Sequence, residues 1–122
     1  MQHIQGEERN QLQIFCLEQV IEADSFVRVI DFFVDSIDLA SFGFKHVTFK
    51  EEGRPPYHPA VLLKLYFYGY RYGIRSSRKL EREAKLNLEV RWLLCEQTPS
   101  ARTICMFRKE YADAFRNIFR KF

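Results

Sequence analysis

The segment over residues 59–72 constrains the fold more than any other part of the sequence, because it is apolar on nearly every side of a helix. Pro59 suits the first turn of a helix, where its missing N–H has no intrahelical partner, and Gly73 is a natural helix stop. Lys64 and Arg71 are the only charged residues in this segment. A helix that is apolar all round must be surrounded by other elements. We therefore expect it at the centre of an all-α fold, a small bundle of several helices.

Residues 25–37 form a second helical pattern, with Asp24 or Ser25 as its cap. Apolar side chains recur here at the spacing of one helix face. They are Phe26, Val29, Ile30, Phe33, Val34 and Ile37. Three acids, Asp31, Asp35 and Asp38, share another face, which we interpret as a solvated acidic face rather than a metal site.

Two short helices are predicted after Gly73. The first covers residues 78–86 with Ser76 or Ser77 as cap, and Glu81 and Lys85 form a favourable i, i+4 pair on it. Its buried stripe consists of Leu80, Ala84 and Leu88. The second covers about residues 88–95 and supplies Trp92 and Leu93 to the core. The run 98–100, Thr-Pro-Ser, then breaks the chain and begins a new helix.

The C-terminal segment, drawn as one helix from about residue 101, has an apolar face and a positive face. At 100° per residue from Arg102, the apolar side chains fall within an arc of about 140° to 220°. They are Ile104, Phe107, Tyr111, Phe115, Ile118 and Phe122. Four cations fall within about 40° of zero, with Asp113 among them. They are Arg102, Lys109, Arg116 and Arg120.

We interpret residues 1–122 as one domain. The two parts of the chain, up to Gly53 and after it, differ in net charge. Residues 1–53 hold four Lys/Arg and ten Asp/Glu, and they form an acidic helical segment. A connector that contains Gly and Pro, at 43–59, joins this segment to the rest of the chain. Residues 54–122 hold fifteen Lys/Arg and six Asp/Glu, so the halves carry net charges of −6 and +9. Many spaced cations within folded sequence are typical of a surface that binds nucleic acid.

The basic half has the parts that DNA binding requires, which are a helix on a small core, polar and cationic side chains at its start, and flanking cations for phosphates. We predict a helix-turn-helix-like unit over residues 74–120 that binds double-stranded DNA. Arg102 and Thr103 are placed to read base edges in this interpretation, and the other residues hold phosphates. The predicted DNA-binding residues are Arg75, Arg78, Lys79, Arg82, Arg102, Thr103, Arg108, Lys109, Arg116 and Arg120.

Catalysis finds little support in the sequence. Cys16, Cys95 and Cys105 lack metal-ligand spacing and are expected to be small buried apolar residues. The three histidines lie in loop or terminal sequence, and no nucleophile, zinc or phosphate-loop motif occurs. We therefore expect no catalytic residue, cofactor or small-molecule substrate in this chain. The polar N-terminus and the lack of a long apolar run predict a cytoplasmic protein without a membrane partner.

A second hypothesis is a module that assembles dimers without touching DNA. Aromatic residues are abundant, and large aromatic side chains dominate many interfaces. In this alternative, the acidic half docks on a basic partner and an aromatic surface makes the contact. The aromatic residues concerned are Tyr66, Tyr68, Tyr70, Tyr72 and Phe119.

Three blocks of sequence resemble a known family. They are GRPPYHPAVLLKL at 53–65, YGIRSSRKLERE at 72–83 and NLEVRWLL at 87–94. In this order they resemble the N-terminal domain of bacterial insertion-sequence transposases, and with a weaker match at 17–37 the resemblance covers about 100 residues. It implies DNA binding at the ends of the mobile element, in the bacterial nucleoid.

The same resemblance implies that catalysis belongs elsewhere. The family carries a separate ribonuclease-H-like domain, whose Asp, Asp and Glu bind divalent metal ions for strand cleavage and transfer. We expect that domain to be absent here, so that this chain is a fragment of a transposase or a gene remnant. The sequence departs from the family where the last helix begins, because Ser100 and Ala101 replace the usual Asp-His pair. Pro99, Thr103 and Phe107 match, as do Arg108 and Lys109.

Overall fold

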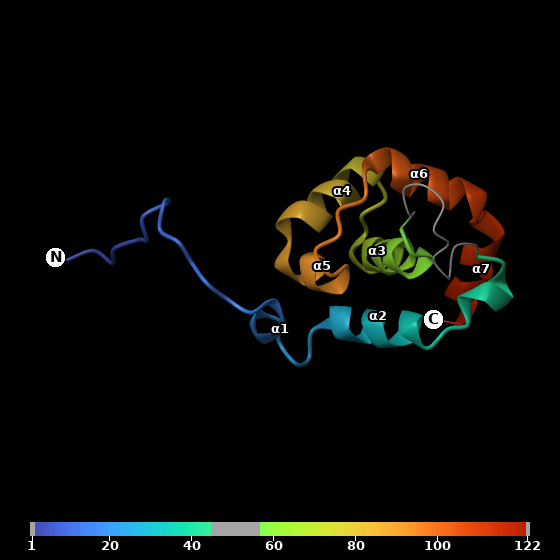
Figure 1. Cartoon of the computed structure of the whole chain (residues 1–122), viewed down its shortest axis with the longest axis horizontal. Coiled ribbons are helices and arrows are strands. Elements are labelled where there is room, and N and C mark those ends of the chain that lie inside the picture. Colours follow the sequence, from blue (N-terminus) through green and yellow to red (C-terminus); the bar gives the residue numbers. More distant parts are fainter. Residues whose placement is uncertain (1, 45–56, 122) are drawn as a thin grey trace, which may run out of the picture.

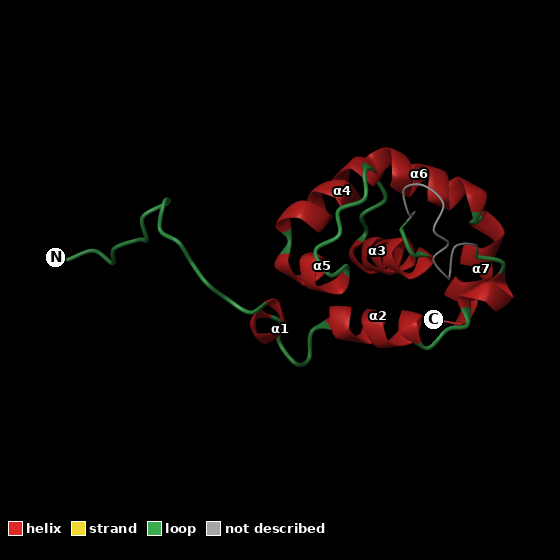
Figure 2. Ribbon diagram, in the orientation of Figure 1, coloured by secondary structure: helices red, strands yellow, loops and turns green. Residues whose placement is uncertain are grey.

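The computed structural model describes residues 2–44 and 57–121, and all regular structure in these ranges is helical (Figure 2). This confirms the all-α prediction. The helices are α1 (Leu17–Val20), α2 (Phe26–Asp35), the 3-10 helix η1 (Leu39–Phe42), α3 (Pro59–Tyr72), α4 (Ser77–Leu86), α5 (Leu88–Leu93), α6 (Ala101–Glu110) and α7 (Ala112–Lys121). Most of the predicted connector at 43–59, and Phe122, lie outside the described residues.

Helix α3 lies at the centre, as its composition predicts. It runs between α2 on one side and α4 and α6 on the other (Figure 1), and it packs on α2, α4 and α5. Leu63, Leu65 and Phe67 are fully buried on it. Its ends are also as expected, because Pro59 is its first residue and Gly73 follows in the left-handed conformation at φ 73°. His58 precedes Pro59 and caps the helix by accepting a hydrogen bond from the Ala60 N–H at 3.1 Å.

The turn from α3 to α4 passes close to Gly69. The Ile74 N–H donates to the Gly69 carbonyl at 2.8 Å, which closes the turn. A Cβ atom at position 69 would lie 2.5 Å from the Ile74 carbonyl oxygen and 3.0 Å from Leu80 Cδ2. Glycine at this position therefore lets the two helices approach each other.

Helix α2 is held on α3 by both charge and ring contacts. Lys64 Nζ lies 2.7 Å from Asp31 and 2.9 Å from Asp35, so both acids form ion pairs with α3, and Asp35 is at the same time exposed as expected. Phe33 meets Phe67 edge to face at 5.5 Å between ring centroids. The predicted apolar face was wrong at one position, because Val29 is 51% exposed. Val27 is buried in its place, since the helix is rotated toward the Lys64 side of α3.

Helices α4 and α5 follow the prediction closely. Ser76 caps α4, and Lys85 Nζ lies 3.3 Å from Glu81. Leu80 and Ala84 are buried, but the expected burial of Leu88 was wrong. Leu88 is exposed because it is the first residue of α5, where Asn87 separates it from α4 and breaks the stripe.

The single C-terminal helix predicted from residue 101 was wrong, because it is two helices. The chain leaves helical geometry at Tyr111, with φ −116° and ψ 30°, between α6 and α7. The predicted buried face nevertheless holds at Ile104, Phe107, Tyr111, Phe115 and Ile118. The break turns α7 toward η1, which it contacts. The apolar spacing is therefore preserved while the helix axis changes direction.

An aromatic cluster fills the space that this break creates. Phe44, which sequence reasoning passed over, is buried with its ring centroid 5.7 Å from Phe107 and 4.8 Å from Tyr111. Phe115 joins the same cluster and meets Tyr66 of α3 edge to face at 5.0 Å. Edge-to-face pairs stabilise beyond the area that they bury. The cluster therefore fixes both η1 and α7 to the central helix.

Two of the tyrosines proposed for a dimer contact are core residues. Tyr66 and Tyr68 are 9% and 6% exposed, and the Tyr66 hydroxyl donates to the Ile104 carbonyl at 2.6 Å. Tyr70 and Tyr72 are exposed, and Phe119 is half-buried against the core. The aromatic surface assumed in the assembly hypothesis is therefore wrong for Tyr66 and Tyr68.

Burial raises the pKa of Tyr66 and of Tyr68 to about 12, because the phenolate loses its hydration inside the fold. Their ordinary value is 10.0, so both groups favour the folded state fully below pH 10. This stabilisation should be lost as the pH rises from 10 to 12. We expect an ultraviolet titration of tyrosinate to show two groups that titrate near pH 12 in the folded protein, and one fewer in Tyr66→Phe. A Tyr66→Phe titration identical to that of the wild type would contradict this.

The expectation that the cysteines are buried was wrong. Cys16 and Cys95 are exposed and Cys105 is half-buried, because Cys16 precedes α1 and Cys95 lies in the turn after α5. Cys95 and Glu96 both have positive φ, at 52° and 66°. Arg91 holds this turn, since its Nε and Nη2 lie 2.7 and 2.8 Å from the Glu96 carboxylate.

We expect Cys95→Gly to raise the free energy of unfolding by about 0.5–1 kcal/mol. A side chain in the left-handed conformation is strained, and glycine relieves that strain. Urea denaturation followed by circular dichroism measures the change. Gln97→Gly is the control, because Gln97 does not have positive φ and a glycine there increases only the entropy of the unfolded chain. A Cys95→Gly protein less stable than the wild type would contradict the assignment of strain.

The N-terminal segment is fixed to the body at α1. Arg28 Nη1 lies 2.6 Å from Glu18 Oε1, and the Trp92 Nε1–H donates to Glu18 Oε2 at 2.5 Å. The Arg28 guanidinium also lies 4.9 Å from the centre of the Trp92 ring. Residues 2–16 precede α1 and extend away from the other helices (Figure 1). Throughout the described residues, the helices are too short or too polar to span a bilayer.

Candidate nucleic-acid interface

Helix α4 carries the densest group of exposed cations. Arg78, Lys79 and Arg82 lie on its outer side, opposite the buried Leu80, and Arg75 precedes it in the turn from α3. All four side chains are exposed, and none forms an ion pair with another described residue. An uncompensated group of cations attracts an extended polyanion.

The beginning of α4 adds backbone donors to these cations. Ser76 accepts one hydrogen bond, from the Lys79 N–H at 3.4 Å. The first N–H groups of a helix lack intrahelical acceptors, and the helix dipole makes this end positive. Arg75 and Arg78 flank this end, which suits a phosphate group.

Helix α6 begins at a well-formed cap next to Arg102. The Thr103 N–H donates to Ser100 Oγ at 3.2 Å, and the two hydroxyl groups lie 3.0 Å apart. Ser100 therefore performs the capping role although it replaces an acid of the family pattern. Arg102 is exposed, whereas Thr103 is half-buried and its hydroxyl is engaged in the cap. Lys109 lies two turns after Arg102 on the same exposed side of α6.

The remaining predicted residues are separated from this side of α6. Arg108 is exposed but its guanidinium lies 6.0 Å from the centre of the Tyr66 ring, on the side of α6 that faces α3. Arg116 and Arg120 are exposed on α7, and Arg116 Nη2 lies 3.9 Å from Asp113. Because the helix breaks at Tyr111, these two cations do not continue the row of Arg102 and Lys109 along one helix axis.

The cations of α4 and α6 lie on neighbouring elements. The two helices pack on each other along one side of the molecule, and α2 runs on the opposite side of α3 (Figure 1). Helix α4 contacts both α5 and α6, so these three helices form one packed unit. The structure therefore brings Arg75, Arg78, Lys79 and Arg82 close to the helix that carries Arg102 and Lys109.

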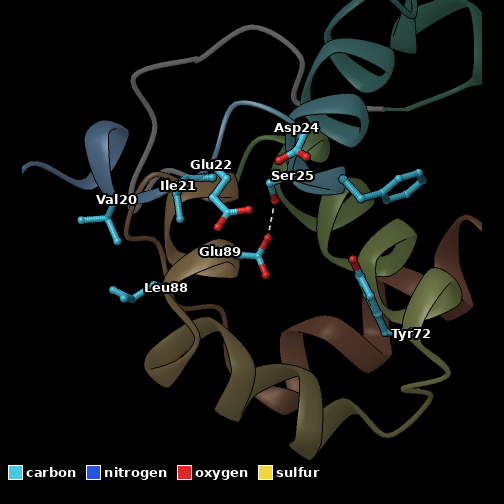
Figure 3. Close-up of a pocket in the computed structure, with 9 residues that line it drawn as sticks. Val20, Ile21, Glu22, Asp24, Ser25, Tyr72, Leu88 and Glu89 are labelled. Carbon is cyan, nitrogen blue, oxygen red and sulfur yellow. Dashed lines mark hydrogen bonds between the residues drawn. The ribbon is translucent and has the colours of Figure 1, made fainter.

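A groove elsewhere on the surface has the opposite charge. It lies between the α1–α2 turn and the start of α5, and Glu22, Asp24 and Glu89 line it (Figure 3). Ser25 Oγ donates to Glu89 across it, and Val20 and Leu88 form its apolar rim. These carboxylates repel phosphate, which separates the groove from any DNA-binding surface. Within the described ranges, no group of three or more His, Cys, Asp or Glu side chains is arranged to hold a metal ion.

The helices that carry these cations fall within a known protein family. The family model of the Transposase domain (DUF772) matches residues 15–110. The chain belongs to this family. The matched part of the transposase domain includes α1 to α6, and hence the cations of both α4 and α6, while α7 follows it. No curated protein and no solved structure matches the chain.

Two further residues on the same sides of these helices were not among the predicted DNA-binding residues. Lys85 is a fourth cation on α4, although it pairs with Glu81, and Met106 is 57% exposed on α6. The sequence spacing from the predicted cations indicates that both residues belong to the same helix faces. Lys85 follows Arg82 and Arg78 by three and seven positions, and Met106 follows Arg102 by four, so each shares a helix face with these cations.

Proposed function

We propose that this transposase domain binds double-stranded DNA through α4 and the outer side of α6, and thereby recognises the ends of a mobile element. The observation that carries the proposal is the set of four exposed cations in and just before α4, which form no ion pair with a described residue. They are Arg75, Arg78, Lys79 and Arg82. Membership of a transposase family supports a role in handling DNA.

In this proposal α4 contacts phosphates and α6 contacts base edges. Contacts to phosphates position a protein on the duplex, and contacts to base edges specify sequence. The α4 cations and the N–H groups at the start of α4 suit phosphates. Arg102 stands in the first turn of α6, where a recognition helix of the helix-turn-helix class approaches base edges in the major groove. Lys109 would then hold the DNA backbone further along α6, and Arg116 and Arg120 would contact phosphates from α7, off that helix axis.

We propose no catalytic role for these residues. Strand cleavage and transfer by metal ions need carboxylates that converge on one point. Among the described acids, Asp31 and Asp35 pair with Lys64 instead, and Glu22, Asp24 and Glu89 line the groove. A catalytic domain of the kind seen in related transposases would supply the metal ions and the chemistry.

The experiment is fluorescence anisotropy of the chain with labelled duplex DNA across a salt series. We expect log affinity to fall linearly with log salt, with a slope of about −0.9 for each phosphate neutralised. Arg102→Ala and Lys109→Ala should each weaken binding, because each removes an exposed cation without removing a described ion pair. Lys121→Ala is the control, since Lys121 lies against Phe42 at 4.9 Å. Affinity that does not respond to salt would sink the proposal.

A role in dimer assembly is the competing hypothesis, and sedimentation in the same buffer tests it. Only two of its five aromatic residues, Tyr70 and Tyr72, have the exposure that an interface of this kind requires. Self-association without DNA binding would favour assembly over our proposal.

A further inference from the structure

We propose that Met106 forms the part of α6 that contacts the C5-methyl group of thymine in the major groove. The inference rests on the proposed function, because it assumes that the outer side of α6 meets duplex DNA. It assigns to one residue the recognition of one chemical group.

Met106 lies in the middle of the exposed side of α6. It follows Arg102 by four positions and precedes Lys109 by three, and residues at these spacings are neighbours on a helix, with Cβ atoms about 5–6 Å apart. The opposite side of α6 is occupied by Ile104 and Phe107, which are buried in the core. A duplex held by Arg102 and Lys109 would therefore face the Met106 side chain directly.

The Met106 side chain does not pack in the core. Its side chain is 57% exposed, whereas an apolar residue that stabilised the fold would be directed toward Ile104 and Phe107. Single exposed apolar residues are common on protein surfaces. Met106 lies between two exposed cations, Arg102 and Lys109, on the helix that packs beside α4. Leu86, which is 62% exposed, is instead the last residue of α4 and follows its cations. The exposed Val29 and Phe32 belong to α2, which runs on the opposite side of α3 from α4 and α6 (Figure 1).

The chemistry of the major groove supplies an apolar partner for it. Thymine presents a methyl group there, cytosine presents an amino donor in the corresponding pair, and apolar side chains contact the thymine methyl. Methionine is unbranched and flexible, so its thioether adapts to the shape of such a contact. Glu110 lies one turn beyond Met106 and is exposed. Its charge repels phosphate at the last residue of α6, so we expect the stretch from Arg102 to Lys109 to face the groove.

The test first selects duplexes from a randomised pool with the wild-type chain. Each thymine of the selected duplex is then replaced singly by deoxyuridine, which removes only the methyl group. We expect the wild type to bind one or two of these duplexes about fourfold more weakly, as for the loss of one buried methyl group. Met106→Ala should bind the thymine and deoxyuridine duplexes equally.

Two further variants separate a methyl contact from a general effect. Met106→Leu keeps an apolar side chain and should retain the preference for thymine. Arg102→Ala should weaken binding to both duplexes by the same factor. Circular dichroism checks the fold of each variant, which an exposed position should leave unchanged.

Each result has one meaning. Equal binding of all deoxyuridine duplexes by the wild type overturns the inference and leaves the proposed function standing. A thymine preference that survives in Met106→Ala also overturns it, because another residue then reads the methyl group. Failure of the wild type to bind any duplex at low salt overturns the proposed function, and the inference with it.

Discussion

Replacing Gly69 by alanine should lower the free energy of unfolding by about 3 kcal/mol, the upper part of the range for overpacking a buried site. The new Cβ would lie 2.5 Å from the Ile74 carbonyl oxygen, which is backbone and cannot rotate away as a side chain would. Relief requires α4 to move away from α3, and this also disturbs Leu80, which is fully buried. Urea denaturation followed by circular dichroism measures the loss.

Gly73→Ala is the matched control, because it lies in the same turn but has no atoms within 4 Å of the added Cβ. Its φ of +73° makes alanine strained, so a smaller cost of about 1 kcal/mol is expected there. A Gly69→Ala protein as stable as Gly73→Ala would contradict the account of the close approach between α3 and α4.

The largest effect on function is expected when the three unpaired cations of α4, Arg78, Lys79 and Arg82, become glutamine together with Arg75, which precedes the helix. If each cation neutralises one phosphate, the slope of log affinity against log salt should become less steep by about three to four, and affinity at low salt should fall roughly 100- to 1,000-fold. Stability should change little, because the four side chains are exposed and unpaired among the described residues.

The control for this variant removes cations that lie away from α4. Arg9→Gln combined with Lys121→Gln takes away positive charge from the N-terminal segment and from the end of α7. It should alter the salt slope by less than one. If the control and the α4 variant lost affinity equally for each charge removed, binding would depend on net charge rather than on the surface formed by α4.

The sequence was most informative where local physics and packing agree. The range of α3 follows from Pro59 and Gly73 together with an apolar composition, and both ends are where these residues place them. The cap of α4 is Ser76, one of the two serines that the sequence offers, and Ser100 of the predicted break caps α6. In these segments the cap, the breaker and the apolar pattern all indicate the same helix.

The features that the sequence did not predict depend on tertiary packing. A helical wheel does not detect the change of axis at Tyr111, because α6 and α7 retain the apolar spacing of one helix. Phe44 has no periodic partner in the sequence, and it is buried only because Phe107, Tyr111 and Phe115 surround it. Val27 is buried instead of Val29, because the face of α2 that packs on the core is the one that carries Val27, Ile30 and Val34.

The candidate site was predictable in composition but not in arrangement. The positive charge of residues 54–122 and the exposure of its cations could be expected from the sequence. The division of these cations between α4, the outer side of α6 and α7 could not, since it depends on where α6 ends. The contact of Arg108 with Tyr66 depends likewise on how α6 packs against α3.

The most direct test of the central claim is to map the surface of the wild-type chain that meets DNA. Amide chemical shifts from a nitrogen-15 correlation spectrum are followed while duplex DNA is added at low salt. The account predicts that the largest changes occur over residues 75–82 and 101–109, with little change over α2 (Phe26–Asp35) on the opposite side of α3. Changes centred on α2, or no changes in any helix, would contradict it.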